Sequence, residues 1–313
     1  MEAWELKQRQ SLPLEAKIVL SRQRIRQWYE HWDGQVYISF SGGKDSTVLL
    51  HLVRELYPDV PAMFVDTGLE FPEIRKHVKT YDNVIITRPR IPFKKVIKEC
   101  GYPVISKDVS NRIRYAKKGS QWAINAMNGL EADGTRRENA FKKNYMKYKY
   151  LLDAPFKVSN QCCEILKETP ARKFERKNKL KPFIGLMATE SRRRKAAYLQ
   201  VGCNVFEGKL KSSRPLMVWT EQDVLQYIKE FNIPYASVYG EIIETSKGLV
   251  TTGESRTGCM FCMFGIHLDK GENKFQRMAK THPKQYDYCI NKLGLGEVLD
   301  YIGVDYRRHN IFD

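Results

Sequence analysis

Three short apolar segments recur at equal spacing in the first third of the chain. They read VYISF (36–40), VPAMFV (60–65) and VIIT (84–87), and their first residues are 24 positions apart each time. Each gap holds one helix-sized segment: TVLLHLVRELY (47–57) has helical periodicity, and the second segment begins near Pro72. Strands that alternate with helices predict a βαβαβ unit with a parallel sheet.

Further elements are predicted on both sides of this unit. From Leu14 to Trp32 apolar residues fall at helical spacing among arginines, which predicts an amphipathic helix that ends before Gly34. FIGLMA (183–188) reads as another core strand, and Thr220 is expected to cap the helix EQDVLQYIKEF. The chain is therefore expected to be an α/β protein.

The same pattern suggests a domain organisation. We expect an N-terminal amphipathic helix within residues 1–35, a nucleotide-binding α/β domain over 36–235, and a C-terminal region over 236–313 that carries a CxxC. In parallel sheets ligands bind at the carboxyl ends of the strands, where SGGKDS and DTG (66–68) both lie.

Composition narrows the class of protein and partner. Hydrophobic residues make up 42% and aromatic residues 12%, as expected for a packed globular chain. The net charge of +17 indicates a surface that attracts polyanions such as nucleic acids or nucleotides. No apolar run approaches the roughly 20 residues that span a bilayer, and the N-terminus does not resemble a signal peptide. We therefore expect a cytoplasmic protein without a membrane partner.

Residues 112–150 form a basic insertion in the nucleotide-binding domain, with ten Lys or Arg against three Asp or Glu. Lysine and arginine track a phosphate backbone, and aromatic rings stack on bases, so this composition favours nucleic-acid contact. A solubilising surface segment is the alternative. The aromatic residues interleaved with the charges are Tyr115, Trp122, Phe141, Tyr145, Tyr148 and Tyr150.

The segment SFSGGKDST (39–47) is the main candidate for chemistry. Gly42 and Gly43 let successive backbone N–H groups point into one concavity, and the following helix adds its positive end. Lys44 adds a full charge, while Ser41 and Ser46 offer hydroxyls. This predicts a phosphate or pyrophosphate site, although a Gly-Gly turn of purely structural purpose is the alternative. The GxxxxGK[ST] spacing of a Walker A loop is missing.

SFSGGKDS resembles the pyrophosphate-binding loop of the adenine nucleotide α-hydrolase superfamily, which includes ATP pyrophosphatases and phosphoadenosine phosphosulfate reductases. Four further segments in the same order resemble the reductase branch, and the similarity covers roughly residues 15–270. They read VDTGLEFPE (65–73), GLMATESRRR (185–194), RPLMVWTEQDVLQYI (214–228) with IPY (233–235), and RTGCMFCMFG (256–265). The resemblance implies a Rossmann-like, parallel-sheet domain of that superfamily, with a helical C-terminal region that carries cysteines.

The resemblance also implies roles for individual residues. Lys44, Asp45 and Ser41 are the expected catalytic residues, with Asp45 as a ligand of the Mg²⁺ that accompanies ATP. Arg192 or Arg194 is expected to contact the anionic end of the nucleotide, although a solvated helix face is an equal alternative for the arginine run. The expected nucleotide-binding set is Ser39, Ser41, Gly42, Gly43, Lys44, Asp45, Ser46, Asp66, Thr67, Gly68, Arg192 and Arg194.

Four of the seven cysteines are clustered in sequence. Cys162 and Cys163 are adjacent, and Cys259 and Cys262 form a CxxC 96 positions further on. These pairs resemble those that hold the 4Fe-4S cluster of sulfonucleotide reductases, with zinc and unliganded thiols as alternatives. The remaining cysteines are expected to be buried apolar residues: Cys100, Cys203 and Cys289.

The chain departs from the assimilatory reductases at its end. Those enzymes resemble one another in a C-terminal Glu-Cys-Gly-Leu-His segment that supplies the nucleophile, whereas this sequence ends DYRRHNIFD. Cys289, in YDYCINK, lies in a different context. The pattern is closest in logic to the ATP pyrophosphatase component of DNA phosphorothioation systems.

That resemblance implies an iron-sulfur ATP pyrophosphatase that activates a nucleic acid, DNA in preference to RNA, for sulfur incorporation. It implies ATP with Mg²⁺, a 4Fe-4S cluster, and a cysteine desulfurase or other sulfur donor as partner. Two alternatives remain open: a sulfonucleotide reductase that uses another thiol, and a DNA-binding regulator that keeps the nucleotide fold without turnover.

Overall fold

The computed structural model describes residues 2–136, 145–208 and 210–308. Six strands form a sheet in the order β3-β2-β1-β5-β7-β6, and all neighbouring pairs are parallel except β6 with β7. The chain divides into two units, of which the first holds this sheet and comprises residues 1–66, 70–88 and 170–258. Its strands are β1 (Val36–Ser39), β2 (Ala62–Val65), β3 (Val84–Thr87), β5 (Lys181–Ile184), β6 (Asn204–Val205), β7 (Ser212–Ser213), and the hairpin β8 (Ile242–Thr245) with β9 (Gly248–Thr251).

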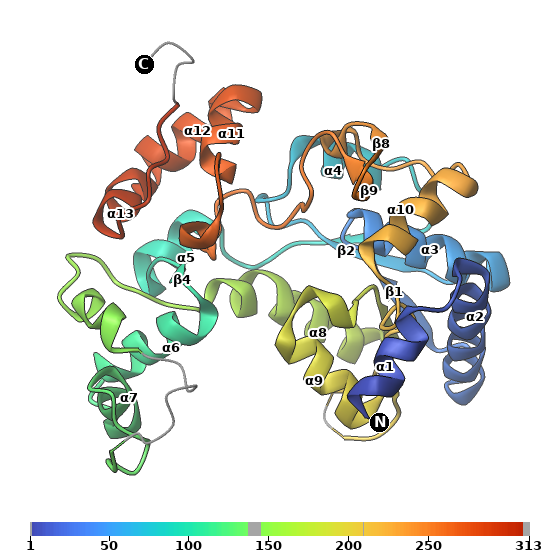
Figure 1. Ribbon diagram of the computed structural model, residues 1–313, viewed down its shortest axis with the longest axis horizontal. Coiled ribbons are helices and arrows are strands. Elements are labelled where there is room, and N and C mark those ends of the chain that lie inside the picture. The colour runs from blue at the N-terminus through green and yellow to red at the C-terminus, as the bar shows by residue number, and fades with distance from the viewer. Residues whose placement is uncertain (1, 137–144, 209, 309–313) are drawn as a thin grey trace. The chain divides into compact units, whose positions relative to one another are not determined.

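The helices of the first unit connect these strands (Figure 1). The side chains of Val48, Leu49, Leu52 and Val53 make α3 an amphipathic helix that is buried along one side. Helices α2 and α3 pack against each other. The bounds are α1 (Ala3–Gln10), α2 (Leu14–His31), α3 (Lys44–Leu56), α4 (Pro72–Val78), α8 (Thr169–Asn178), α9 (Arg192–Val201) and α10 (Glu221–Glu230).

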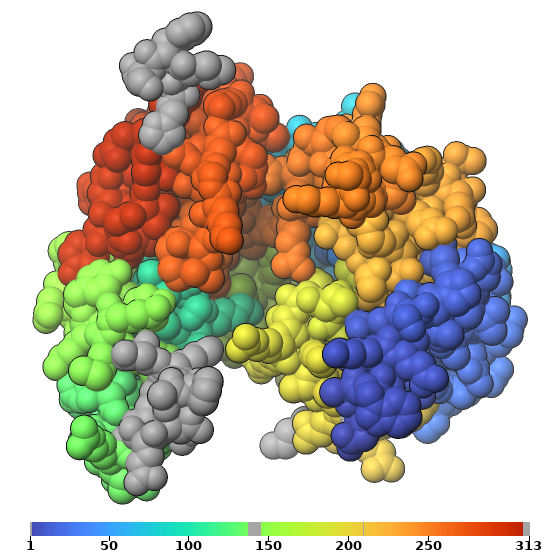
Figure 2. Space-filling view, in the orientation of Figure 1, coloured from blue at the N-terminus to red at the C-terminus, as the bar shows by residue number. Residues whose placement is uncertain are grey.

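The α/β architecture with its parallel βαβαβ core is as predicted. The strand expected over 60–65 begins only at Ala62; before it, the carbonyl of Pro61 accepts a hydrogen bond from Ile38. Thr220 caps α10 as expected, since its hydroxyl accepts a hydrogen bond from the backbone of Asp223. Helix α1 was not predicted; Arg9 at its end donates to the hydroxyl of Tyr198, where the N-terminal residues lie against α9 (Figure 2).

The strand expected over 183–188 is shifted in the structure to Lys181–Ile184. The chain leaves the sheet at Gly185, which lies close against the start of α3. A Cβ atom at this position would be 3.1 Å from the carbonyl oxygen of Asp45 and 3.2 Å from the Cα of Ser46. Gly185 therefore permits the close approach of β5 to the glycine loop, which is a tertiary requirement that strand propensity does not reveal.

The second unit comprises residues 67–69, 89–169 and 259–313 and is mainly helical. Strands β4 (Val104–Ile105) and β10 (Met263–Phe264) pair in parallel within it. The C-terminal region is helical and carries the CxxC, as expected. Its helices are α5 (Phe93–Cys100), α6 (Lys107–Ala116), α7 (Gln121–Met127), α11 (Lys274–Thr281), α12 (Pro283–Asp287) and α13 (Leu295–Tyr301), with 3-10 turns at Met146–Leu152 and elsewhere and π-helical turns at Glu164–Glu168 and Tyr288–Lys292. The domain boundaries expected at residues 35 and 235 remain predictions.

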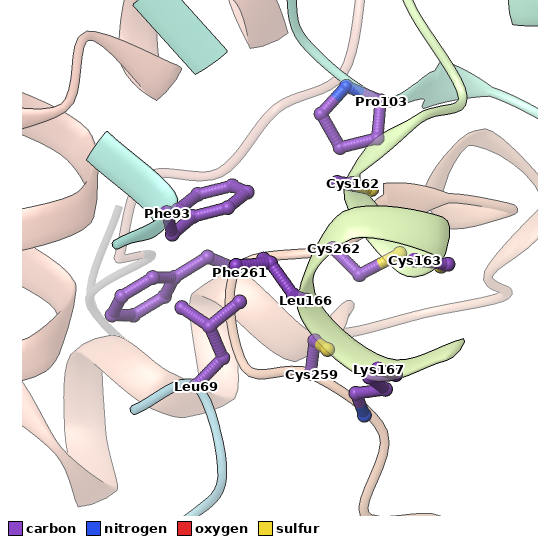
Figure 3. A pocket seen from close by; sticks show the side chains of 10 residues that line it. All are labelled: Leu69, Phe93, Pro103, Cys162, Cys163, Leu166, Lys167, Cys259, Phe261 and Cys262. Atoms are coloured by element: carbon purple, nitrogen blue, oxygen red, sulfur yellow. The ribbon is translucent and has the colours of Figure 1, made fainter. Parts of the chain in front are cut away.

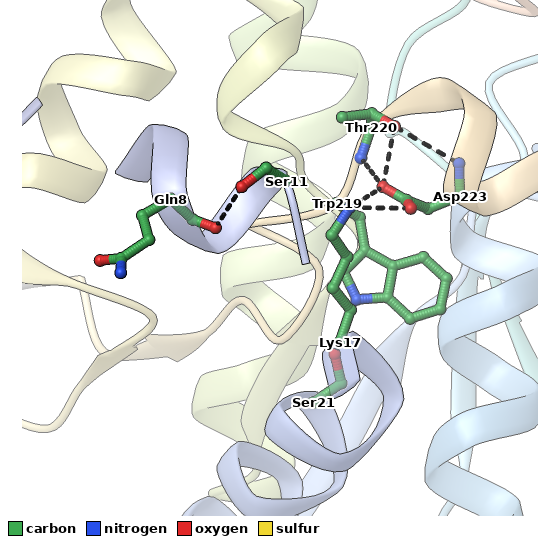
Figure 4. Close-up of polar contacts among 7 residues, drawn as sticks. All are labelled: Gln8, Ser11, Lys17, Ser21, Trp219, Thr220 and Asp223. Atoms are coloured by element: carbon green, nitrogen blue, oxygen red, sulfur yellow. Dashed lines mark hydrogen bonds and ion pairs between the residues drawn. The ribbon is translucent and has the colours of Figure 1, made fainter. Parts of the chain in front are cut away.

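Helix α2 is joined to α10 and the segment before it by a buried polar cluster (Figure 4). The ammonium of Lys17 lies 2.8 Å from each carboxylate oxygen of Asp223, and both side chains are almost fully buried. One turn along α2, the hydroxyl of Ser21 accepts a hydrogen bond from the indole of Trp219 and donates to the carbonyl of Pro215. No helix in the described part of the chain is long and apolar enough to cross a membrane.

Candidate functional site

The glycine loop joins β1 to the N-terminus of α3, and its own hydroxyls hold its shape. The hydroxyl oxygens of Ser41 and Ser46 are 2.9 Å apart, and Ser46 donates to the carbonyl of Gly43 at 2.9 Å. Gly43 is the N-cap, so the first N–H groups of α3 point out of the helix into the loop. This arrangement concentrates backbone donors at one place, as an anion site requires. Ser39, the last residue of β1, is paired in the sheet with Met63 and Ile184.

Gly42 is the residue that makes this turn sterically possible. Its φ of +73° lies in the left-handed region, and a Cβ atom would come within 2.7 Å of Val78 and 2.8 Å of Ile74 on α4. Glycine is therefore required twice, for backbone conformation and for space.

We expect Gly42→Ala to lower the free energy of unfolding by about 2–4 kcal/mol, because it adds left-handed strain to overlap with two side chains. Chemical denaturation measures the change. The matched control is Gly208→Ala, where φ is +84° but nothing lies within 4 Å. Equal losses in the two variants would show that the space beside α4 is not limiting.

Lys44 begins α3, and its ammonium is held by partners inside the first unit. It lies 2.7 Å from the carbonyl oxygen of Ser255, 3.1 Å from a carboxylate oxygen of Glu221, and 5.3 Å from the ring centre of Tyr239. The side chain is buried. A phosphate bound in the loop therefore has to compete with Glu221 for this ammonium.

Asp45 follows at the second position of α3, and it is the least satisfied polar group of the loop. Its Oδ1 atom is buried and has no hydrogen-bond partner among the described residues. Burial raises the pKa of this carboxyl, and the nearby Lys44, Arg256 and Arg194 act in the opposite direction. A buried carboxylate oxygen without a donor is the type of group that a divalent cation satisfies, so Asp45 fits the Mg²⁺ ligand expected from the sequence.

The arginine run separates into different roles at the start of α9. Arg192 is exposed, whereas Arg194 is half-buried and forms an ion pair with Glu190. Burial lowers the pKa of Arg194, and the neighbouring guanidinium of Arg256 lowers it further. Arg256 also reaches Glu190, with 3.2 Å between Nη2 and Oε1. Of the two arginines, Arg194 is therefore the one whose charge acts on Asp45, and Arg192 is exposed to solvent.

The DTG segment is divided between the two units. Asp66 directly follows β2 and belongs to the first unit. Its side chain is buried and forms ion pairs with Arg75 at 3.1 Å and with Arg88 at 3.3 Å. Thr67 and Gly68 belong to the second unit, where the hydroxyl of Thr67 accepts a hydrogen bond from Leu69. The contacts of Asp66, Thr67 and Gly68 with a nucleotide remain predictions.

Sequence reasoning missed several residues that surround the loop. The hydroxyl of Tyr239 accepts the backbone N–H of Lys44 at 3.2 Å and lies 2.5 Å from the hydroxyl of Thr257. Burial raises the pKa of Tyr239 to about 12. Arg256 and Thr257 open the segment RTGCMFC, which was identified by its resemblance to the reductase branch and by its two cysteines, without a role for these two residues. Glu190 likewise directly precedes the arginine run. These residues could have been found from the sequence only because they lie next to motifs that were already identified.

The four clustered cysteines line one pocket of the second unit (Figure 3). Cys162 and Cys163 are contributed by the helical turn that precedes residue 164, and Cys259 and Cys262 by the loop before β10. The rest of the lining is mainly apolar and includes Leu69, Phe93 and Phe261. The fold thus brings together two pairs that are far apart in sequence. Of the other three cysteines, Cys203 and Cys289 are buried, as expected, whereas Cys100 is half-buried.

The two adjacent thiols of the pocket differ in acidity. A hydrogen bond with Cys162 lowers the pKa of Cys163 to about 6, with a further contribution from Lys107 and Lys167, and the same bond raises the pKa of Cys162. Lys274 donates to the carbonyl of Cys259 at 3.3 Å. The donor set, four thiols in a mainly apolar pocket, is of the type that holds an iron-sulfur cluster. In the described ranges, however, no three Cys, His, Asp or Glu side chains form a group that could hold a metal ion.

The aromatic side chains of the basic insertion contact one another and its own arginines. The guanidinium of Arg112 lies 4.2 Å from the ring centre of Tyr145 and 5.2 Å from that of Trp122, which is itself 5.4 Å from Tyr115. These rings have structural partners within the second unit, so exposed lysines are the better candidates for phosphate contact. Among the described rings of the insertion, that of Tyr150 is the most exposed. Phe141 lies outside the described residues. Nucleic-acid contact remains a prediction.

The chain matches one protein family over most of its length. Residues 35–103 and 116–263, more than half of the chain, match the family described as the phosphoadenosine phosphosulfate reductase domain. A phosphoadenosine 5'-phosphosulfate reductase of Proteus mirabilis is 24% identical over 229 residues, covering 73% of this chain and 72% of that protein. An adenosine 5'-phosphosulfate reductase of Geobacillus kaustophilus is 22% identical over 238 residues, covering 75% and 80%.

One relative is much longer than the matched region. An uncharacterized protein of Methanocaldococcus jannaschii is 26% identical over 277 residues, which are 86% of this chain but 43% of that protein. Among solved structures, the phosphate complex of a phosphoadenylyl-sulfate reductase from Candida auris aligns with a TM-score of 0.39 at 16% identity, covering 77% of this chain and 98% of that chain. A U34-tRNA thiolase of Methanococcus maripaludis with its 4Fe-4S cluster aligns with 0.36 at 14% identity, covering 90% and 78%. Neither alignment is close enough to carry an argument.

Proposed function

Because the chain belongs to the phosphoadenosine phosphosulfate reductase domain family, whose members are enzymes that act on nucleotides and sulfur, we propose that it is an iron-sulfur ATP pyrophosphatase. Its product is an adenylylated nucleic-acid acceptor, most simply a DNA phosphate, that is ready for sulfur incorporation. An acceptor oxygen attacks the α-phosphorus of ATP, the α–β bridging bond breaks, and pyrophosphate leaves with the electron pair. A sulfur donor, such as a cysteine desulfurase together with a thiol reductant, then supplies sulfur at the sulfide level. This sulfur bonds to the activated phosphorus, and AMP leaves with the electron pair of the broken P–O bond.

The observation that carries this proposal is the buried, unpartnered carboxylate oxygen of Asp45 at the start of α3. Around it three cations face three carboxylates: Lys44, Arg194 and Arg256 against Asp45, Glu190 and Glu221. A site that is already neutral suits a polyphosphate that arrives with its own divalent cation. Mg²⁺ held by Asp45 neutralises charge on the departing pyrophosphate, and the loop N–H groups hold its oxygens.

The test is direct. Purified protein is incubated with ATP and Mg²⁺, with and without DNA or RNA, and released pyrophosphate is measured. We expect release that depends on Mg²⁺ and increases with DNA. The absence of ATP turnover with every nucleic acid, together with tight, salt-sensitive DNA binding, would instead favour the non-catalytic regulator.

A sulfonucleotide reductase is the second candidate, because several relatives carry that name. Such a reaction needs a nucleophilic thiol besides the four clustered ones. Cys289 is fully buried, donates to the carbonyl of Tyr286, and has a pKa that burial raises to about 12. These properties oppose a nucleophilic role for Cys289. Sulfite release from adenylyl sulfate with a reductant would favour this reading.

The cluster is proposed to be held by Cys162, Cys163, Cys259 and Cys262, and when bound it supplies iron for electron transfer or sulfur handling. We expect anaerobically purified protein to be brown, with about four irons per chain.

Cys259→Ser is expected to remove most of this iron and the visible absorption, because a hydroxyl is a poor ligand for a cluster built on thiolates. Iron and sulfide analysis measures the loss. Cys100→Ser is the matched control, since Cys100 lies at the end of α5 and does not line the pocket. A colourless wild-type protein with one zinc per chain would contradict the cluster assignment.

A further inference from the structure

Two arginines from distant segments of the first unit meet at one carboxylate. Glu190 lies in the 3-10 turn Ala188–Glu190 that follows β5, and its side chain is only 14% exposed. One of its oxygens contacts Arg194 and the other lies 3.2 Å from Nη2 of Arg256. The backbone N–H of Met187 donates to the carboxylate at 2.9 Å, so the carboxylate itself is fixed.

The carboxylate of Glu190 offsets the repulsion between the two arginines. Two guanidinium groups that contact the same carboxylate lie close enough to repel each other. A carboxylate between them offsets the repulsion and fixes their separation. Each guanidinium carries five N–H donors, and Glu190 uses only part of them.

The remaining donors are available to a ligand. The side chain of Arg256 is 65% exposed and that of Arg194 is 36% exposed, so both reach solvent. The residues on either side of Arg256 contact the start of α3: the carbonyl of Ser255 accepts a hydrogen bond from Lys44, and the hydroxyl of Thr257 lies 2.5 Å from that of Tyr239. The unpartnered oxygen of Asp45 is buried at this same helix start. Planar guanidinium groups at a fixed separation suit phosphate oxygens better than flexible ammonium groups do.

We propose that Glu190 is a positioning residue that holds Arg194 and Arg256 as a clamp for the pyrophosphate part of a nucleotide. This pyrophosphate clamp (Glu190, Arg194, Arg256) deepens the proposed function, because it assigns a binding site to the leaving group. Arg256 is a direct ligand of the anion, and Glu190 acts only through the two arginines.

The sign of one substitution separates positioning from simple charge. Glu190→Gln removes a negative charge beside an anion site, so Coulomb attraction alone predicts tighter binding of pyrophosphate. If Glu190 positions the clamp, binding weakens, because the two guanidinium groups move apart. We expect the Kd for inorganic pyrophosphate with Mg²⁺ to rise by about tenfold in the variant, the equivalent of one lost charge-assisted hydrogen bond.

The experiment is isothermal titration of the full chain with inorganic pyrophosphate and, separately, with AMP, at fixed ionic strength. Arg256→Ala, at an exposed side chain, is expected to weaken pyrophosphate binding without altering thermal stability. AMP binding should not change in either variant, because AMP lacks the phosphates that the clamp holds, whereas a general folding defect lowers both affinities. Arg193→Ala is the matched control, since Arg193 is an exposed arginine of the same helix turn.

Pyrophosphate that binds Glu190→Gln as tightly as the wild type, or more tightly, overturns the proposal. So does an unchanged affinity in Arg256→Ala. Wild-type protein that binds pyrophosphate through these residues but releases none from ATP would leave the clamp in place and reject the pyrophosphatase. Release from ATP that both variants retain in full, with unchanged affinity, would reject the clamp alone.

Discussion

Lys44→Ala is expected to lower the rate of pyrophosphate release from ATP by about 10²–10³-fold. Removing one preorganised donor from the site of developing charge typically has an effect of this size. Lys44 is the first residue of α3, beside the backbone donors of the loop. Its ammonium lies 3.1 Å from a carboxylate oxygen of Glu221 and 2.7 Å from the carbonyl oxygen of Ser255. On ATP binding, phosphate oxygens replace Glu221 as its anionic partner.

A companion variant tests whether this ammonium acts on phosphate or on loop packing. Glu221→Gln removes the competing carboxylate, so ATP affinity should stay equal or increase. A loss in Glu221→Gln as large as that in Lys44→Ala would indicate that the ion pair holds the loop together. Lys76→Ala, at an exposed lysine of α4, is the charge control. Release within threefold of wild type in Lys44→Ala would contradict a catalytic role.

The second large effect concerns stability. Lys17→Met is expected to lower the free energy of unfolding by about 3–5 kcal/mol, because it leaves the carboxylate of Asp223 buried without its cation. The Asp223 carboxylate keeps its bonds from the backbone and hydroxyl of Thr220, at 2.6 and 2.7 Å, so the cap of α10 persists. Urea denaturation measures the change.

A double-mutant cycle isolates the pair. Lys17→Met combined with Asp223→Asn removes both charges while keeping an acceptor for Thr220, so the double variant should lose less stability than the sum of the single losses. Arg22→Met is the control on the same helix: its partner Glu55 is exposed, and the expected loss is below about 1 kcal/mol. Additive losses at Lys17 and Asp223 would contradict a coupled buried pair.

The elements that were predictable from the sequence are those whose residues act locally. The helical periodicity of 47–57 and the capping residue Thr220 each indicate one helix, and the 24-residue spacing of the strands indicates a repeated βαβ connection. The early end of β5 was not predictable, because glycine is needed at position 185 for its close contact with the backbone of Asp45, which is distant in sequence. Tyr239 is another such case: its hydroxyl reaches Lys44 across 195 positions. A single sequence carries no record of such contacts.

The same limit applies to the cysteines and arginines. The pairing of Cys162 and Cys163 with a distant CxxC rested on resemblance, and the shared pocket agrees with it. The two arginines are distinguished by their contacts, because Arg194 forms an ion pair with Glu190 whereas Arg192 is exposed. Spacing alone left Arg192 and Arg194 equivalent.

The interleaving of the two units has a consequence for synthesis. The chain leaves the second unit after residue 169 and returns to it at residue 259, so the 96 positions between the cysteine pairs must be made before the pocket has all its thiols. At about 5–20 residues per second, Cys162 and Cys163 wait for roughly 5–20 seconds on the ribosome. Until then Cys162 and Cys163 lack the other two thiols of the pocket, so the site with all four thiols can form only late in synthesis.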